Sequence, residues 1–131
     1  MPERYGWMGT ILRVDLSQGR VTKEPLTDDL AYEFIGGRGI NSKILYDETG
    51  PATDPLGPDN RLIVGVGPLT GTLVPGSGRF TVTAKSPLTG ILGDGNAGGD
   101  CDRCLCVYLR LDRVSLCCDI FSYQSIHYHH Y

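Results

Sequence analysis

Short runs of alternating apolar and polar residues open the chain. Residues 10–16 alternate as a strand does, residues 17–19 read as a turn, and residues 20–25 resume as a returning strand, so a β-hairpin is predicted. The first strand would carry Leu12, Val14 and Leu16 on one face, and Ile11, Arg13 and Asp15 on the other.

Two helical stretches follow the hairpin. Thr27 is a suitable N-cap, and the two aspartates after it put negative charge where the helix dipole favours it. Gly36-Gly37 would stop this helix, and a second helix is predicted over residues 40–47. The expected buried stripes are Leu30, Ala31, Phe34 and Ile35 in the first helix, and Ile40, Ile44 and Leu45 in the second.

The remaining pattern to residue 100 is one of strands and glycine turns. Residues 51–60 form a proline-rich loop before residues 62–64, an apolar run expected to be buried on both faces. Further strands are predicted at residues 79–84 and from residue 91, with a turn at residues 86–90. Several short strands joined by glycine turns favour a sheet-rich α+β fold over a doubly wound sheet.

The glycines after residue 64 suggest two nucleotide-binding motifs, a dinucleotide-binding fingerprint and a P-loop. A fingerprint requires a helix to start at once after the strand, yet Pro68 and Pro75-Gly76 would break one. A P-loop requires a Lys-Ser/Thr pair that does not follow. Two interpretations remain: the glycines only make tight turns, or they let the backbone approach a ligand.

Composition excludes some partners. The net charge of −3 and pI of about 5.5 give no electrostatic footprint for nucleic acid. No apolar run approaches the roughly 20 residues of a membrane span. The first ten residues lack the apolar core of a secretory signal, so we expect a cytoplasmic protein.

The composition changes abruptly near residue 100. All 18 glycines and all 8 prolines precede it, whereas all 5 cysteines and all 3 histidines follow it. We therefore predict a domain over residues 1–100 and a Cys/His-rich tail over residues 101–131 that is not native to that domain.

Several motifs in the first hundred residues give a more specific signal than the glycines alone. These are YGWMGTILRVDLSQG, GGRGINSKIL, DPLGPDNRLIVGVGPLTGT, GSGRF, AKSPLTG and GNAGG. In this order and spacing they resemble the N-terminal domain of the tungsten-containing aldehyde ferredoxin oxidoreductase family. The resemblance implies an incomplete, sheet-rich cofactor-binding domain of α+β class.

The resemblance also implies site residues. Arg79 of GSGRF would contact a cofactor phosphate, and Gly98 and Gly99 would bring backbone N–H groups against the pterin or phosphate. The region of Asn96 would help to hold a magnesium ion that bridges the cofactor phosphates. Without the family, Arg79 reads as a solvated or ion-paired surface arginine and Asn96 as a left-handed turn residue. Lys85 is expected to be exposed beside a turn, with no role.

At the level of the whole enzyme, the family oxidises aldehydes to carboxylic acids on a tungsten (or molybdenum) bis-pterin cofactor. Electrons pass through a [4Fe–4S] cluster to ferredoxin, and the resemblance allows a homodimer of the full-length protein. The catalytic groups and the cluster ligands belong to later domains and are absent here. We therefore expect this chain to be a truncated part of the enzyme, inactive on its own.

The tail supports other interpretations. Cys101, Cys104, Cys117 or Cys118 and one of His127, His129 and His130 could form a tetrahedral zinc site, and Cys101-x-x-Cys104-x-Cys106 could ligate iron–sulfur, although not with the usual spacing. The tail has no glycine or proline for a zinc knuckle, and its alternating residues 107–116 have no evident partner. We favour an out-of-frame end; a small zinc-binding or interaction module and a non-functional product are the alternatives.

Overall fold

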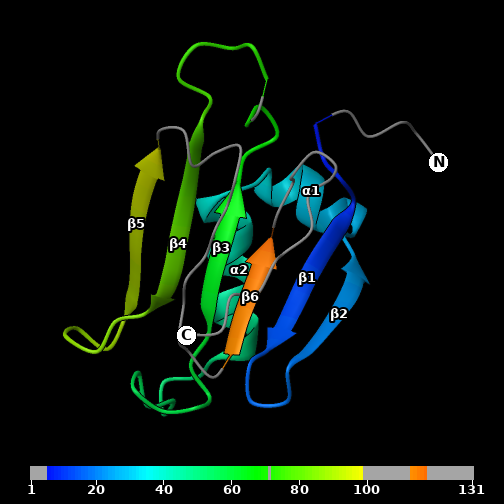
Figure 1. Ribbon diagram of the computed structural model, residues 1–131. Helices are drawn as coiled ribbons and strands as arrows, with labels where there is room; N and C mark the ends of the chain where they lie inside the picture. Colours follow the sequence, from blue (N-terminus) through cyan, green and yellow to red (C-terminus); the bar gives the residue numbers. More distant parts are fainter. Residues whose placement is uncertain (1–5, 71, 99–112, 118–131) are drawn as a thin grey trace, which may run out of the picture.

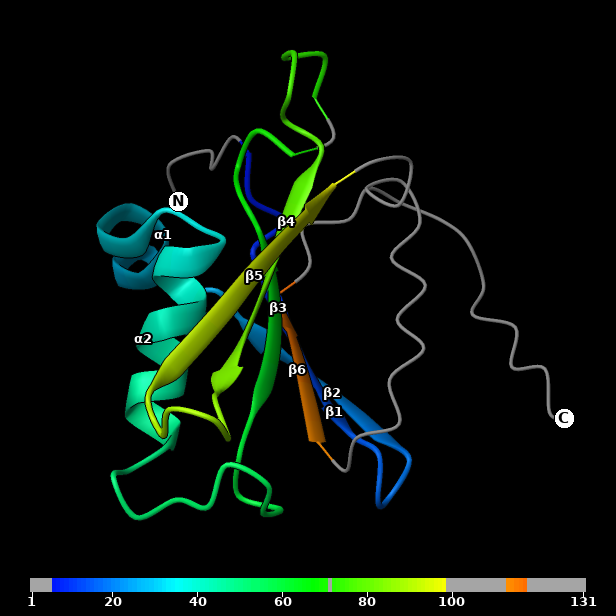
Figure 2. The same cartoon turned by 90° about the vertical axis from the view of Figure 1, so that its left-hand side faces the viewer.

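A single mixed sheet with both helices on one face forms the fold. The computed structural model describes residues 6–70, 72–98 and 113–117. The strands lie in the order β2-β1-β6-β3-β4-β5 (Figure 1), and Figure 2 shows α1 and α2 together on one side of them. The predicted sheet-rich α+β class is confirmed.

The first two strands form the predicted hairpin. β1 (Thr10–Asp15) pairs antiparallel with β2 (Arg20–Pro25). Ile11 is buried, whereas Leu12 and Val14 are half-buried on the opposite face. The helices thus cover the less apolar face of β1, which sequence alternation alone does not reveal.

The helices follow the prediction closely, with one correction. In α1 (Asp28–Phe34) the Thr27 hydroxyl oxygen accepts a hydrogen bond from the Leu30 N–H at 3.4 Å, as a cap should. Ile35, expected in the buried stripe, is instead 60% exposed with φ of +64°. The chain turns there so that the Gly37 N–H can donate to Val66 O at 2.9 Å.

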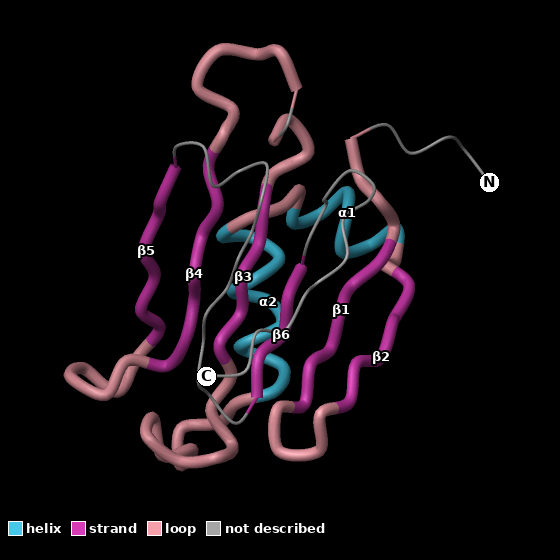
Figure 3. Tube along the Cα trace, viewed as in Figure 1, coloured by secondary structure: helices cyan, strands magenta, loops and turns pink. Residues whose placement is uncertain are grey.

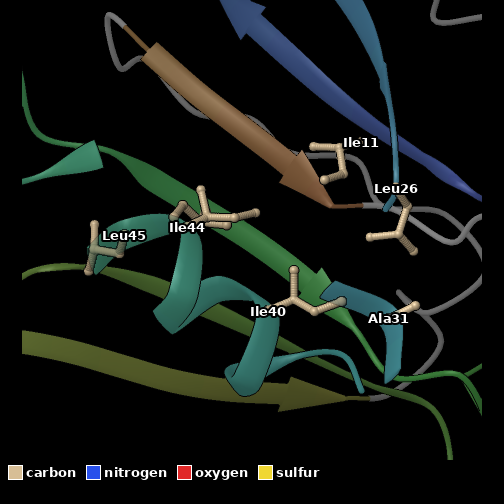
Figure 4. Close-up of a cluster of buried hydrophobic side chains, with 7 residues drawn as sticks. Ile11, Leu26, Ala31, Ile40, Ile44 and Leu45 are labelled. Carbon is tan, nitrogen blue, oxygen red and sulfur yellow. The ribbon is translucent and has the colours of Figure 1, made fainter. Parts of the chain in front are cut away.

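The second helix packs against the middle of the sheet. α2 (Arg38–Glu48) buries Ile40, Ile44 and Leu45, as predicted. The core lies between the helices and the sheet, and Figure 4 shows its side chains converging from both. The buried cluster consists of Ile11, Leu26, Ala31, Ile40, Ile44, Leu45 and Ile63.

The other long strands form an antiparallel meander (Figure 3). It contains β3 (Leu62–Val66), β4 (Arg79–Lys85) and β5 (Leu92–Gly98). Ile63 and Val64 are 0% and 1% exposed, which confirms burial on both faces. A turn rather than a helix follows β3, where the Thr70 N–H donates to Gly67 O at 3.0 Å.

A strand from the tail completes the sheet. β6 (Arg113–Cys117) pairs antiparallel with β1 and parallel with β3. It therefore joins the hairpin to the meander. The sequence suggested no packing partner for the alternating residues of the tail, but residues 113–117 pair with a strand on each side.

Candidate functional site

Three of the four predicted cofactor residues meet at the end of the meander. Arg79 is the first residue of β4, and it lies opposite Gly98, the last residue of β5. Asn96 lies two residues before Gly98 on the same strand. They border an open hollow with a volume of about 360 Å³, lined by Gly76, Gly78, Arg79, Asn96, Ala97 and Gly98. The fourth residue, Gly99, lies outside the described residues.

Arg79 is exposed at this hollow, and it takes part in none of the ion pairs found among the described residues. Three other arginines are paired with carboxylates: Arg13 and Arg61 contact Glu48, and Arg38 contacts Asp94. An unpaired guanidinium offers several N–H donors in a fixed plane, an arrangement that matches phosphate or carboxylate oxygens.

Gly98 must be a glycine for steric reasons. A Cβ at this position would lie 2.8 Å from Gly78 O and 3.2 Å from Arg79 Cγ. The loop before β4 therefore lies directly against the end of β5. The close approach leaves bare backbone beside the arginine, so a ligand can come near main-chain groups.

Asn96 lies in an extended strand, not in the left-handed turn that its sequence GNAGG allowed. Its Oδ1 accepts a hydrogen bond from the Thr81 hydroxyl at 2.6 Å. Within the described part of the chain its Nδ2 has no hydrogen-bond partner, and the residue is exposed. The neighbouring Asp94 accepts from Arg38 Nε at 2.7 Å, so the carboxylate closest in sequence is neutralised.

A buried asparagine lies beneath the site and was missed by sequence reasoning. Asn41 of α2 is 0% exposed, and its Nδ2 donates to Thr81 O at 3.0 Å, to Thr83 Oγ1 at 3.2 Å and to Ile63 O at 3.4 Å. A signal was available: the residue lies three and four positions before Ile44 and Leu45, within the predicted buried stripe.

Lys85 corrects an expectation. It is 8% exposed rather than solvated, and its Nζ donates to the carbonyl oxygens of Gly50, Pro51 and Thr53 at 3.0, 2.9 and 2.8 Å. The reason is alternation along β4, which turns Lys85 toward the helix side with Thr81 and Thr83. Its long side chain there reaches the loop that follows α2.

A second hollow, of about 410 Å³, borders the hairpin and contains Arg13 and Arg61. Burial lowers the pKa of Arg13, but hydrogen bonds and charge from Glu24 and Glu48 outweigh it, and the pKa is raised above its ordinary value. Because these arginines are paired with carboxylates that join β1 and α2, the cluster serves the fold.

The predicted zinc and iron–sulfur ligands lie outside the residues with described side chains. Cys117 belongs to β6, and the other cysteines and all three histidines lie in residues 99–112 and 118–131, which the structure does not describe. Among described residues, no group of three or more His, Cys, Asp or Glu could hold a metal ion.

In residues 6–70, 72–98 and 113–117, no helix is long and apolar enough to cross a membrane.

The family model described as "Aldehyde ferredoxin oxidoreductase, N-terminal domain" matches residues 11–107, which include all of β1 except Thr10, the elements from β2 to β5 and the whole described site. The chain belongs to this family. The match extends seven residues beyond the expected boundary at residue 100.

Two curated relatives show the same similarity. The tungsten-containing aldehyde ferredoxin oxidoreductases of Thermococcus kodakarensis and Pyrococcus furiosus are 47% and 45% identical over 95 residues. That region is 72% of this chain and 16% of each relative, so the chain spans a small part of these enzymes.

A solved structure has the same fold. It is titled as the active site complex BamBC of benzoyl coenzyme A reductase with 1,5-dienoyl-CoA, and it matches with a TM-score of 0.74 at 31% identity. The match covers 87% of this chain and 17% of that one. The fold of this chain is therefore also found in a part of that larger solved protein.

Proposed function

We propose that this chain supplies the phosphate-binding edge for a tungsten (or molybdenum) bis-pterin cofactor in an aldehyde oxidoreductase. The observation that carries the proposal is the meeting of Arg79, Asn96 and Gly98 at one open hollow. These are the residues that the family resemblance implies, and the fold brings them together from two strands.

The residues present fit a phosphate group. Arg79 offers N–H donors with no competing carboxylate among the described residues, and charge-assisted hydrogen bonds to phosphate are strong and directional. Gly98, with Gly99 after it, would offer main-chain N–H groups that no side chain covers. Asn96 would contribute an oxygen to a magnesium ion, which prefers oxygen ligands and keeps several waters.

The chemistry of the proposed enzyme lies beyond these residues. A bound tungsten pterin would supply the redox step from aldehyde to carboxylic acid, and the chain would contribute position and charge. Ferredoxin as electron acceptor, a [4Fe–4S] cluster, a cytoplasmic location and a homodimer are part of the same proposal for the full-length protein. This chain alone would be inactive, because it spans 16% of its relatives.

The domain boundary is proposed at residue 100, with a tail of separate origin. Supporting it is the change of composition there; against it stand the family match to residue 107 and the inclusion of residues 113–117 in the sheet. A zinc-binding tail is retained as the alternative from another functional class.

The test is titration of this chain with inorganic pyrophosphate, with and without Mg²⁺, by calorimetry. We expect Arg79→Ala to weaken binding about 10- to 100-fold, because a charge-assisted pair is lost. Arg20→Ala removes an exposed arginine from β2 and is the matched control, with unchanged affinity expected. Equal affinity of wild type and Arg79→Ala would refute the proposal.

A further inference from the structure

Thr81 and Asn96 form a hydrogen-bonded pair across β4 and β5, and Asn96 lines the hollow. The two residues lie directly opposite each other in the antiparallel register. Thr81 is 7% exposed, whereas Asn96 is exposed. The pair therefore joins a buried hydroxyl to a side chain at the surface of the site.

The direction of the hydrogen bond determines whether Asn96 presents its NH₂ group or its carbonyl oxygen to a ligand. The Thr81 hydroxyl lies 2.6 Å from Asn96 Oδ1 and donates to it. The Oδ1 and Nδ2 atoms are on opposite branches of the amide, so anchoring the oxygen below directs the NH₂ group away from Thr81. That NH₂ group can donate two hydrogen bonds and accept none.

Thr81 is itself fixed from beneath. Its carbonyl oxygen accepts a hydrogen bond at 3.0 Å from Asn41, which is fully buried in α2. Rotamer freedom that is removed before a ligand arrives does not have to be lost on binding. Hydrogen bonds therefore link Asn41 of α2 to Thr81 of β4, and Thr81 to Asn96 of β5, before any ligand is bound.

We infer that Thr81 is a positioning residue that orients the Asn96 side chain as a hydrogen-bond donor to an anionic phosphate oxygen. The inference rests on the proposed function and deepens it. It also bears on the magnesium assignment, because the Thr81 hydroxyl occupies one of the two lone pairs of Asn96 Oδ1.

Two variants of Thr81 and one control test the inference in this chain. Thr81→Val keeps the shape and the strand propensity but removes the hydroxyl, and Thr81→Ser restores the hydroxyl. Thr83→Val is the matched control, because Thr83 is also buried on β4 and bonded to Asn41 but lies opposite Asp94 rather than Asn96. Thermal unfolding confirms that each variant is folded.

The first readout needs no ligand. In ¹H–¹⁵N spectra the Asn96 NH₂ pair, assigned by its loss in Asn96→Asp, should move toward the shifts of a free amide in Thr81→Val. It should stay in place in Thr81→Ser and Thr83→Val. An unmoved pair in a folded Thr81→Val variant would overturn the inference.

The second readout is binding of inorganic pyrophosphate in the presence of a chelator. Thr81→Val and Asn96→Ala should each weaken binding about tenfold, the factor that one hydrogen bond to a charged ligand provides. Thr81→Ser and Thr83→Val should stay within about twofold. If Asn96→Ala weakens binding only when Mg²⁺ is present, its side chain acts through the cation and the inference is wrong.

The two proposals fail separately. If the wild type binds pyrophosphate and Arg79→Ala does not, a Thr81→Val variant with wild-type affinity overturns the positioning role alone. If the wild type does not bind pyrophosphate, the proposed function fails and the donor role of Asn96 fails with it.

Discussion

At the scale of single residues, Lys85 explains how a loop without regular structure is held. Its Nζ contacts three carbonyl oxygens of the segment after α2, and it is almost fully buried. Asn60 ties the same region to β4, because its side-chain amide donates to Lys85 O at 3.0 Å and its Oδ1 accepts from the Lys85 N–H at 3.2 Å. The proline-rich loop after α2 is thus held by a charged side chain and by hydrogen bonds rather than by apolar packing.

We expect Lys85→Met to destabilise the chain by about 2 kcal/mol, because three carbonyl groups lose the charged donor that the buried Lys85 side chain provides. Chemical denaturation with urea measures the change. Lys43→Met is the control: Lys43 pairs with Asp47 at 2.7 Å on the exposed face of α2, and losing it should cost about 0.5 kcal/mol or less. Equal effects of the two substitutions would contradict the role of burial.

At the scale of elements, α2 approaches β3 unusually closely. A Cβ on Gly65 would lie 2.1 Å from Asn41 Oδ1, so this point of β3 has no room for a side chain. The same Oδ1 is buried and has no hydrogen-bond partner among the described residues. Asn41 Nδ2 thus makes three hydrogen bonds to the sheet. In the same arrangement Asn41 Oδ1 lies next to Gly65 without a hydrogen-bond donor among the described residues.

Gly65→Ala should therefore lower the stability by about 1–3 kcal/mol through overpacking. The cost should shrink in an Asn41→Ala background, where the clashing amide is gone, so a double-mutant cycle is the measurement. Gly95→Ala is the matched control, since a Cβ there meets nothing within 4 Å, and its effect should stay within about 0.5 kcal/mol. Additive effects at positions 41 and 65 would argue against direct contact.

At the scale of the whole molecule, the sheet depends on a strand from the tail. β6 lies between β1 and β3, and it is the only strand of the described residues that pairs with both the hairpin and the meander. Backbone groups of a central strand have partners on both sides, so a proline there leaves ladder hydrogen bonds unmade.

Val114→Pro should destabilise the chain by about 1–3 kcal/mol, because proline has no N–H to donate within a strand that is paired on both sides. Hydrogen exchange should show lost protection in β1 and β3, which face position 114 at Val14 and Leu62. Val114→Ala keeps the N–H and serves as the control. Unchanged exchange in β1 and β3 would mean that residues 113–117 contribute nothing to the sheet, in agreement with a tail foreign to the domain.

Local patterns were enough to predict most elements and the family. The Thr27 cap, the stripe of Ile40, Ile44 and Leu45 and the apolar run before Gly65 each act within a few residues, so the sequence predicted their place correctly. The family motifs also pointed to Arg79, Asn96 and Gly98 before any geometry was known. Their proposed role in cofactor binding stays a prediction.

Tertiary structure decided what depends on partners distant in sequence. Alternation defines two faces of β1, but only the position of the helices selects the face of Ile11 for burial. Lys85 is buried because a loop 32 to 35 residues earlier in the chain lies within its reach. The orientation of Asn96 is likewise set by Thr81 across the sheet, through a hydrogen bond spanning 15 residues of sequence. Contacts of this kind are absent from any local pattern, because they exist only once the strands have paired.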